Sequence, residues 1–542
     1  MSIMHQALCV REVLANVFRS LEPSDLFSCA LVCEDWTDIA LDPLWREVDL
    51  RAIISPFSTS CRDMEEGALG FWRPIKHADW ERFDWYARRV RTLSLDFDWY
   101  HEPSVELFAE MALKKPSSVL LPNLRRLEVS STSAKTLSFP LIFMSENVTE
   151  LLFRFPGDRD DYGDLNGYID DFFLEVSKRM PKLKTLEVYN PRFRENTRHS
   201  AAESSISEFL SSTKCLEAFI CFPYCITSYM MEYLSRLPNL QVVGMKWGQS
   251  IARSRRSSLH FDRWFSPGPF PSLVDLSFCA TFTAAMDMME FDLAPKLVAL
   301  HIHSPQAETA DSTRRLLLVL ARKHPKLSKL RLTSLGSNAN GHLQLPDGGD
   351  RIDESTLSPL LNISSLTSFG ITYHRQLYLY NHSLKGFLTN WPALENLSLC
   401  SDPCQQEQPC LTSNSLAVIA ECCPKLRRLS LYIDTRIRES SYPSRLSFLE
   451  RIEFGMSPLA EEDVTDFALF LSEVLPPTCN TASLCDISWG GLVEPELRSN
   501  GLKTLNEDWK NWSELSKTLS LLLKARSRER YRVRELEGLR AL

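Results

Sequence analysis

The 542-residue sequence has no long run of hydrophobic residues. Its longest apolar stretches, such as Leu316 to Ala321, are far shorter than the roughly 20 residues with which a helix crosses a bilayer. The first 18 residues lack the basic start, apolar run and small-residue cleavage site of a secretory signal, and there is no C-terminal lipidation box. We therefore expect no membrane partner and a location in the cytoplasm, the nucleus or both.

Signals of catalysis and of metal binding are sparse as well. There are only 11 histidines, and the chain shows neither a phosphate-cradling glycine loop nor a nucleophile elbow. His301 and His303 alternate on an expected strand and point the same way, but no third or fourth zinc ligand can be named. The net charge of −8 disfavours nucleic acid, which attracts clustered lysine and arginine. We expect no enzyme activity, no cofactor, no metal and no nucleic-acid partner.

The 15 cysteines do not form a framework of disulfides or metal knuckles. Their number is odd, and the densest group, "CSDPCQQEQPC" at 400–410, is spaced C-x3-C-x5-C instead of in paired C-x2-C units. Cys29, Cys221 and Cys279 stand where an apolar residue would fit. This usage predicts reduced, mostly buried thiols, as in cytosolic or nuclear proteins.

What the sequence contains instead is one short motif repeated along its length. Proline is followed by L-x-x-L-x-L, as in "PNLRRLEV" (122–129), "PKLKTLEV" (181–188) and "PKLRRLSL" (424–431). The alternation predicts a short half-buried strand. A helical pattern such as "TRRLLLVLARKH" (313–324) precedes most copies. About thirteen copies occur, five of them weaker copies without the proline. Their first apolar residues, the anchors, are 90, 124, 148, 183, 216, 240, 273, 297, 327, 366, 394, 426 and 449, and those without the proline are 90, 148, 216, 366 and 449.

The recurring order of helix, proline, strand and loop predicts an α/β solenoid. Neighbouring units bury one another's apolar faces, so parallel strands should line the concave face and helices should lie outside. The alternative, a doubly wound α/β domain, is disfavoured because thirteen strands exceed one open sheet of that kind. The pattern resembles leucine-rich repeats, although the asparagine or cysteine that usually follows the strand is missing.

Residues 7–50 do not follow the repeat. Apolar stripes predict two short helices on either side of "EPSD" (22–25), and "LDPLW" (41–45) restarts the chain. A bundle of about three short helices is too small to hide all its apolar residues. The surplus predicts a face for docking another helix, although the same residues would also serve to pack the bundle against the first repeats.

The spacing E-V-L-x-x-V-F-x-x-L-x-x-x-D-L-x-x-x-x-x-V-C-x-x-W, which starts at Glu12, resembles an F-box. The following "ALDPLWREVDL" (40–50) resembles the junction with a fungal-type substrate domain, while Val10 and Arg11 replace a usual proline. The resemblance implies a substrate receptor of an SCF-type ubiquitin ligase that docks a Skp-type adaptor and, through it, a cullin scaffold. The adaptor-binding residues that it implies are Val13, Leu14, Val17, Phe18, Leu21, Asp25, Leu26, Val32, Cys33, Trp36, Leu44 and Trp45.

The solenoid's strands would then hold a target protein. Residues that flank the second leucine of each motif point away from the core, and they carry both charge signs, which favours a protein or peptide ligand. A non-catalytic scaffold that acts outside ubiquitin transfer is the alternative. The predicted target-binding residues are Arg126, Glu128, Glu187, Tyr189, Lys246, Asp275, His301, His303, Lys329, Arg331, Arg428 and Tyr432.

Four segments follow from these patterns. They are an F-box-like bundle at 1–50, a linker and first cap at 51–87, the solenoid at 88–490, and a helical cap or tail at 491–542. We interpret the acidic stretch 157–171 as an inter-repeat loop rather than a calcium site. The basic, serine-rich stretch 252–258 is interpreted as a loop that is open to phosphorylation.

Overall fold

The computed structural model describes residues 10–57, 61–63, 69–71, 73–97, 105–130, 134–154, 165–189, 201–221, 226–245, 269–291, 293–334, 350–403, 407–437, 445–481 and 502–540. The chain divides into two compact units. The first comprises Met1–Cys225 with Leu237–Leu240, and the second comprises Ile226–Arg236 with Gln241–Leu542. Within the described ranges, no helix combines the length and the apolar character needed to cross a membrane.

The first unit begins with three short helices that pack together. They are α1 (Arg11–Phe18), α2 (Pro23–Ala30) and α3 (Glu34–Leu44), and α3 contacts both of the others. Pro23 lies in the first turn of α2, where its missing N–H leaves no hydrogen bond unmade. Asp25 follows in the same turn, where the helix dipole favours a negative charge.

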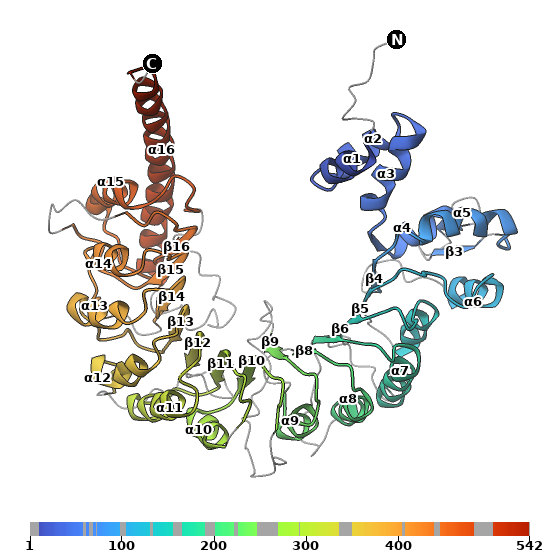
Figure 1. Ribbon diagram of the computed structural model, residues 1–542, viewed down its shortest axis with the longest axis horizontal. Coiled ribbons are helices and arrows are strands. Elements are labelled where there is room, and N and C mark those ends of the chain that lie inside the picture. The colour runs from blue at the N-terminus through green and yellow to red at the C-terminus, as the bar shows by residue number, and fades with distance from the viewer. Residues whose placement is uncertain are drawn as a thin grey trace. The chain divides into compact units, whose positions relative to one another are not determined.

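A parallel sheet follows in the first unit, and helices cover one of its two sides (Figure 1). Its strands, in spatial order, are β1 (Glu47–Asp49), β4 (Thr92–Asp96), β5 (Arg126–Ser130), β6 (Glu150–Arg154), β7 (Thr185–Tyr189) and β8 (Ala218–Cys221). The helices are α4 (Leu50–Ile54), α5 (His77–Ala87), α6 (Val105–Lys114), α7 (Leu165–Arg179) and α8 (Ala201–Ser212), with 3-10 turns at Ser55–Phe57 and Ala134–Ile142. A separate antiparallel pair joins β2 (Cys61–Asp63) to β3 (Leu69–Phe71).

The second unit repeats the same layering of parallel strands and helices (Figure 1). Its strands are β9 (Val242–Met245), β10 (Asp275–Cys279), β11 (Ala299–Ser304), β12 (Lys329–Ser334), β13 (Ser368–Thr372), β14 (Asn396–Leu399), β15 (Arg428–Leu431) and β16 (Arg451–Glu453). Its helices are α9 (Ser228–Ser235), α10 (Phe282–Glu290), α11 (Ala310–Lys323), α12 (Glu354–Leu357), α13 (Asn381–Thr389), α14 (Ser415–Cys422), α15 (Val464–Val474) and α16 (Leu502–Arg540).

The thirteen anchors predict the strands closely. Each anchor is followed two residues later by the first residue of a strand, from β4 after residue 90 to β16 after residue 449. Parallel pairing brings the second leucines of neighbouring motifs into register, as at Leu93, Leu127 and Leu151, and all three are buried. The predicted leucine-rich-repeat solenoid is therefore confirmed in its strand positions, its parallel pairing and its layers.

The sheet starts earlier than residue 88, where the sequence predicts that the solenoid begins. Val48 is the single buried residue of β1, whose neighbours Glu47 and Asp49 are exposed, so the strand has too little apolar pattern to be found from sequence. β1 pairs with β4 directly after the helical bundle. The bundle is thus joined to the sheet without a linker.

The last repeat is covered by α16, which packs along α15. Trp512 is 2% exposed, and its Nε1 donates a hydrogen bond to the carbonyl oxygen of Ser457 at 3.0 Å. Leu515 and Leu519 continue the buried side of the helix, whereas Trp509 on another side is exposed. A helix with one apolar side closes the open end of a solenoid in this way.

Candidate functional site

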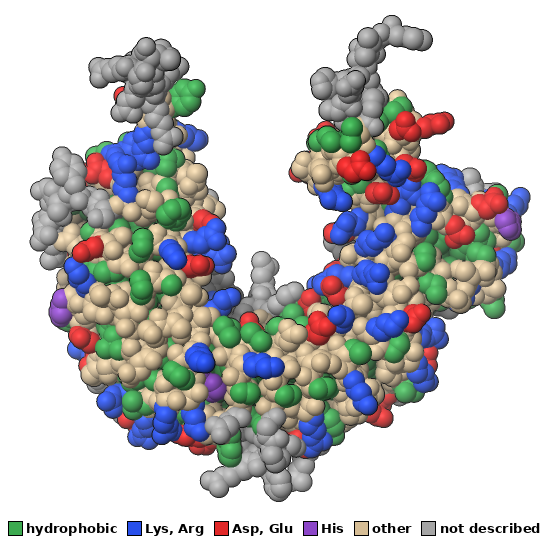
Figure 2. Space-filling view, in the orientation of Figure 1, with side chains coloured by type: hydrophobic (Ala, Val, Ile, Leu, Met, Phe, Trp, Pro, Cys, Tyr) green, Lys and Arg blue, Asp and Glu red, His purple; other side chains and the backbone are tan. Residues whose placement is uncertain are grey.

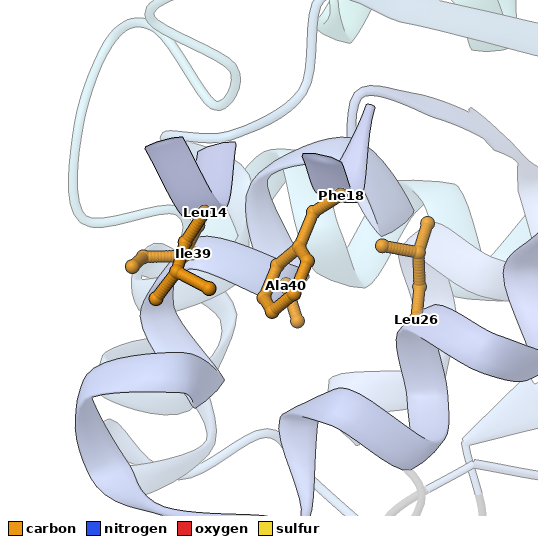
Figure 3. Packing of buried hydrophobic residues seen from close by; sticks show 5 residues of the cluster. All are labelled: Leu14, Phe18, Leu26, Ile39 and Ala40. Carbon is orange, nitrogen blue, oxygen red and sulfur yellow. The ribbon is translucent and has the colours of Figure 1, made fainter. Parts of the chain in front are cut away.

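The helical bundle has a core of its own (Figure 3). Leu14, Phe18 and Leu26 are each less than 5% exposed and pack with Ile39 and Ala40 of α3. The sequence predicts Leu14, Phe18 and Leu26 as adaptor-binding residues, but the structure places all three inside the bundle. These three side chains therefore stabilise the bundle from inside and are not exposed for contact with a partner.

A second group of predicted residues is half-buried. Leu21, Trp36 and Leu44 pack against the bundle core, and the rings of Phe18 and Trp36 meet edge to face at 5.3 Å between centroids. Trp45 instead stacks on Tyr86 of α5, with ring centroids 4.2 Å apart. These side chains hold the bundle together or attach it to the first repeat.

The remaining predicted adaptor-binding residues are exposed. Val13 and Val17 lie one turn apart on α1, Val32 and Cys33 follow α2, and Asp25 lies at the start of α2. On α1, Leu14 and Phe18 face the core of the bundle, whereas Val13 and Val17 lie on the opposite, exposed side. These residues are available to a partner in the free chain.

Sequence reasoning missed the most exposed apolar residues of the bundle. Phe27 is 62% exposed and Leu31 is 74% exposed, and Val10 also faces solvent. Phe27 directly follows the buried Leu26, so it cannot share its side of the helix; this offset is the signal that could have found it. We refer to Val10, Val13, Val17, Phe27, Leu31 and Val32 as the exposed apolar residues of the bundle.

Arg89 fastens the bundle to α5. Its side chain is nearly buried, forms ion pairs with Asp38 and Asp42 of α3, and lies 3.2 Å from Asp42 through Nε. Nη1 donates a hydrogen bond to the carbonyl oxygen of Trp85 at 2.7 Å, and the guanidinium lies 4.7 Å from the centre of the Trp85 ring. The attachment therefore uses charged and aromatic side chains and leaves the exposed apolar residues of the bundle uncovered.

The outward side of the first unit's sheet carries a charged network around Arg126. Its guanidinium reaches Glu128 at 2.7 Å, Glu150 at 3.0 Å and Glu187 at 3.2 Å, which joins β5, β6 and β7. Burial alone would lower the pKa of Arg126, but the hydrogen bonds to Glu128 and Glu150 and the charge of Glu187 raise it above its ordinary value. Glu187 is buried and accepts a hydrogen bond from the hydroxyl of the half-buried Tyr189.

The corresponding side of the second unit's sheet is richer in cations. Lys329 and Arg428 are exposed, and neither forms an ion pair within the described ranges. Burial lowers the pKa of Arg331 to about 10, although the charge of Glu453 opposes the shift. Burial also raises the pKa of Asp275, and the positive charge of Lys329 partly offsets this rise.

Some predicted target-binding residues are not accessible. His303 and Tyr432 are buried, as is Glu187 of the first unit, so none of the three offers surface to a target. His301 is held neutral, because burial and the charges of Arg331 and His303 lower its pKa well below the ordinary value. Lys246 lies outside the described residues.

Other candidate chemistry finds little support in the part of the chain that the structure describes. No three histidine, cysteine, aspartate or glutamate side chains converge there in a way that could hold a metal ion. The Cys400 thiol donates to the backbone carbonyl oxygens of Tyr373 and Arg375, and burial raises the pKa of Cys423 to about 12. Residues 157–164 and 252–258 lie outside the described residues.

The helical bundle is similar to a known family of domains. Residues 11–51 match the family model described as F-box-like, and no curated protein matches the sequence. Among solved structures, a chain of the yeast Rad7–Elc1 complex aligns with 13% identity over 81% of this chain and 96% of that one, with a TM-score of 0.36. A chain of the Drosophila Toll–Spatzle complex aligns with 13% identity over 70% and 49%, with a TM-score of 0.26. The protein thus has an F-box-like domain at residues 11–51, followed by a leucine-rich-repeat solenoid.

Proposed function

We propose that this chain is the target-binding subunit of an SCF-type ubiquitin ligase, of the fungal F-box type. The F-box-like domain would bind a Skp-type adaptor and, through it, a cullin scaffold. The observation that carries the proposal is that a domain matching the F-box-like family keeps six large apolar side chains in solvent, although it has a core and an attachment of its own.

Phe27 and Leu31 are the proposed anchors of adaptor binding. They lie four residues apart, Phe27 in α2 and Leu31 directly after its last residue, and they are the most exposed apolar residues of the bundle. Fully burying one such side chain stabilises a complex by about 1.5–3 kcal/mol. Interfaces usually depend on a few large anchors of this kind, with smaller contacts around them.

The target would bind on the outward side of the strands. Lys329 and Arg428 are the proposed contacts in the second unit, because both are exposed and neither forms an ion pair within the described ranges. In the first unit, Arg126 and its three carboxylates offer a locally acidic surface. A protein target with both charge signs fits these surfaces better than a uniform polyanion does.

Catalysis by the ligase would be positional. A receptor raises the effective concentration of a target beside the ubiquitin-carrying enzyme, so it needs no acid, base or nucleophile of its own. Arg89 and the stack of Trp45 on Tyr86 fix the F-box-like domain to the first repeat, which supports a constant geometry. The cysteines of the described ranges are not joined in disulfides, which suits the cytoplasm or the nucleus, where we place the protein.

The test is co-purification of the full chain with a purified Skp-type adaptor. The variant Phe27→Ala/Leu31→Ala should lose most adaptor binding while its unfolding temperature stays unchanged, since neither side chain belongs to the core. Leu113→Ala is the matched control, because Leu113 is 85% exposed on α6, away from the bundle. If the wild-type chain does not bind the adaptor, the alternative of a scaffold outside ubiquitin transfer replaces this proposal.

A further inference from the structure

In the first unit, the residues that directly precede the strands of the parallel sheet are joined by a regular series of backbone hydrogen bonds. The backbone N–H of Arg91 donates to the carbonyl oxygen of Arg46 at 2.9 Å, and that of Arg125 donates to Arg91 at 2.8 Å. The N–H of Thr149 then donates to the carbonyl oxygen of Arg125, and the same pattern continues through Lys184 to Glu217. We call this set the pre-strand ladder, and its members are Arg46, Arg91, Arg125, Thr149, Lys184 and Glu217.

Charges later in the ladder are neutralised by their neighbours. Lys184 forms an ion pair with Glu217 at 2.7 Å. At the equivalent positions of the second unit, the Nε of Arg427 donates to Glu450 at 2.8 Å. Opposite charges on adjacent strands attract, and like charges repel, at the strand spacing of about 4.8 Å.

The first three positions break this rule. Arg46, Arg91 and Arg125 directly precede three adjacent strands, and none of the three forms an ion pair within the described ranges. Burial, the charge of Arg46 and that of Arg125 lower the pKa of Arg91. Asp42 opposes this shift, but its carboxylate is already paired with Arg89.

In the part of the chain that the structure describes, no carboxylate is paired with any of the three arginines. Arg91 Nη1 donates to the carbonyl oxygens of Arg88 and Val90, at 2.9 and 3.1 Å, so its hydrogen bonds go to neutral groups. Arg46 and Arg125 are exposed and Arg91 is half-buried, and Arg88 at the end of α5 adds a further exposed arginine. Figure 2 shows lysine and arginine side chains gathered beside β4 and β5. Unlike the rest of the ladder, this stretch keeps an uncompensated positive charge.

We propose that Arg46, Arg91 and Arg125 form a docking surface for an acidic segment of a protein partner. This surface lies outside both the exposed apolar residues of the bundle and the outward side of the strands, so it adds to the proposed function. Arginine suits the role because its planar guanidinium binds carboxylates through two parallel hydrogen bonds. Binding would also remove the mutual repulsion of the three side chains.

The dimensions favour a short acidic peptide over a nucleic acid. Three adjacent strands span about 10 Å, and alternate residues of an extended segment lie about 6.6 Å apart on one side. Two such carboxylates span about 6.6 Å and three span about 13 Å, so the two lengths bracket the span of the three arginines. Nucleic-acid binders use about 6–10 phosphate contacts, which exceeds what this ladder offers in a chain of net charge −8.

The test uses the full chain and a fluorescent peptide with three glutamates at alternate positions, separated by serines. Arg46→Thr/Arg125→Thr should weaken peptide binding about tenfold, since two exposed charge pairs are lost. Threonine is chosen because Thr149 occupies the next ladder position, so the fold already accommodates it. The unfolding temperature should stay the same or rise, because repulsion is relieved.

The matched control is Lys184→Thr/Arg427→Thr, which changes the same ladder position at two residues that already have partners. It should bind the peptide as the wild-type chain does. Equal loss in both double variants, equal binding of a peptide with lysine in place of glutamate, or tighter binding of a single-stranded DNA 12-mer would overturn the proposal. Adaptor binding is measured alongside: if it is absent while the peptide binds, the proposed function fails and this inference stands.

Discussion

Arg126 on β5 and Glu187 on β7 form an ion pair at 3.2 Å across the intervening strand, although 61 residues separate them in sequence. Glu187 is buried, whereas Arg126 is partly exposed and also binds Glu128 and Glu150. One guanidinium thus links three repeats, and it pairs with a carboxylate whose burial would be costly without a partner of opposite charge.

Removing that guanidinium should destabilise the first unit. Arg126→Gln leaves Glu187 buried without its charged partner, and we expect the free energy of unfolding to fall by about 2–3 kcal/mol. Lys214→Gln is the control, because Lys214 is exposed in the first unit, forms no ion pair within the described ranges and should change stability by less than about 0.5 kcal/mol. Urea unfolding measures both, and equal losses would contradict the role of Arg126.

The end of the solenoid should depend on one tryptophan of α16. Trp512→Ala removes a buried ring that stacks on Phe454, with centroids 5.4 Å apart, and we expect a loss of about 3–5 kcal/mol. Trp509→Ala, on an exposed side of the same helix, should cost little. Thermal unfolding compares the two variants, and a loss for Trp509 that matches the loss for Trp512 would mean that α16 packs differently.

The F-box-like domain should loosen when Arg89 is changed. Arg89→Gln removes the charge that pairs with Asp38 and Asp42, so backbone amides of α3 should exchange hydrogen faster. Arg82→Gln, at an exposed site on the same helix as Trp85, should leave exchange in α3 unchanged. Hydrogen exchange read by mass spectrometry tests this, and unchanged protection of α3 in Arg89→Gln would show that the aromatic stack suffices.

Stability should fall in mild acid because of His374. Burial and the charge of Arg375 lower its pKa to about 4, against roughly 6.5 in the unfolded chain. The unfolded state therefore binds the proton first, so this contribution is fully present above pH ~6.5 and is lost, by about 3 kcal/mol, as the pH falls toward 4. His374→Phe keeps the ring contact with Tyr373 and should flatten the pH dependence of the unfolding temperature. His77→Phe, at an exposed site, should not.

The sequence predicts the repeats well because their signal is local. An anchor and two alternating apolar residues, with a proline before the anchor in eight of the thirteen copies, specify each strand within eight residues, and parallel pairing follows from the helix between strands. β1 is missed because Val48 is its single buried residue, with no alternation to reveal it. The prediction therefore succeeds where several residues of one segment indicate the same strand.

The candidate site is harder to predict from sequence because its residues do not belong to the apolar pattern that marks the buried side of a helix or strand. A helical stripe identifies the side that is buried, so matching an F-box by its apolar spacing selects core residues such as Leu14 and Phe18 together with surface ones. Phe27 and Leu31 are found only once the core is known. The network of Arg126 and the pre-strand ladder depend on register between repeats, which irregular insertions conceal.

The most direct test of adaptor docking is calorimetric titration of a purified Skp-type adaptor into the full chain at several temperatures. Docking through the exposed apolar residues of the bundle predicts saturable one-to-one binding with a negative heat-capacity change, which is the signature of apolar burial. Phe27→Ala/Leu31→Ala should reduce both the affinity and the heat-capacity change. Absence of binding, or binding that this double variant leaves unaltered, would contradict the assignment of these residues.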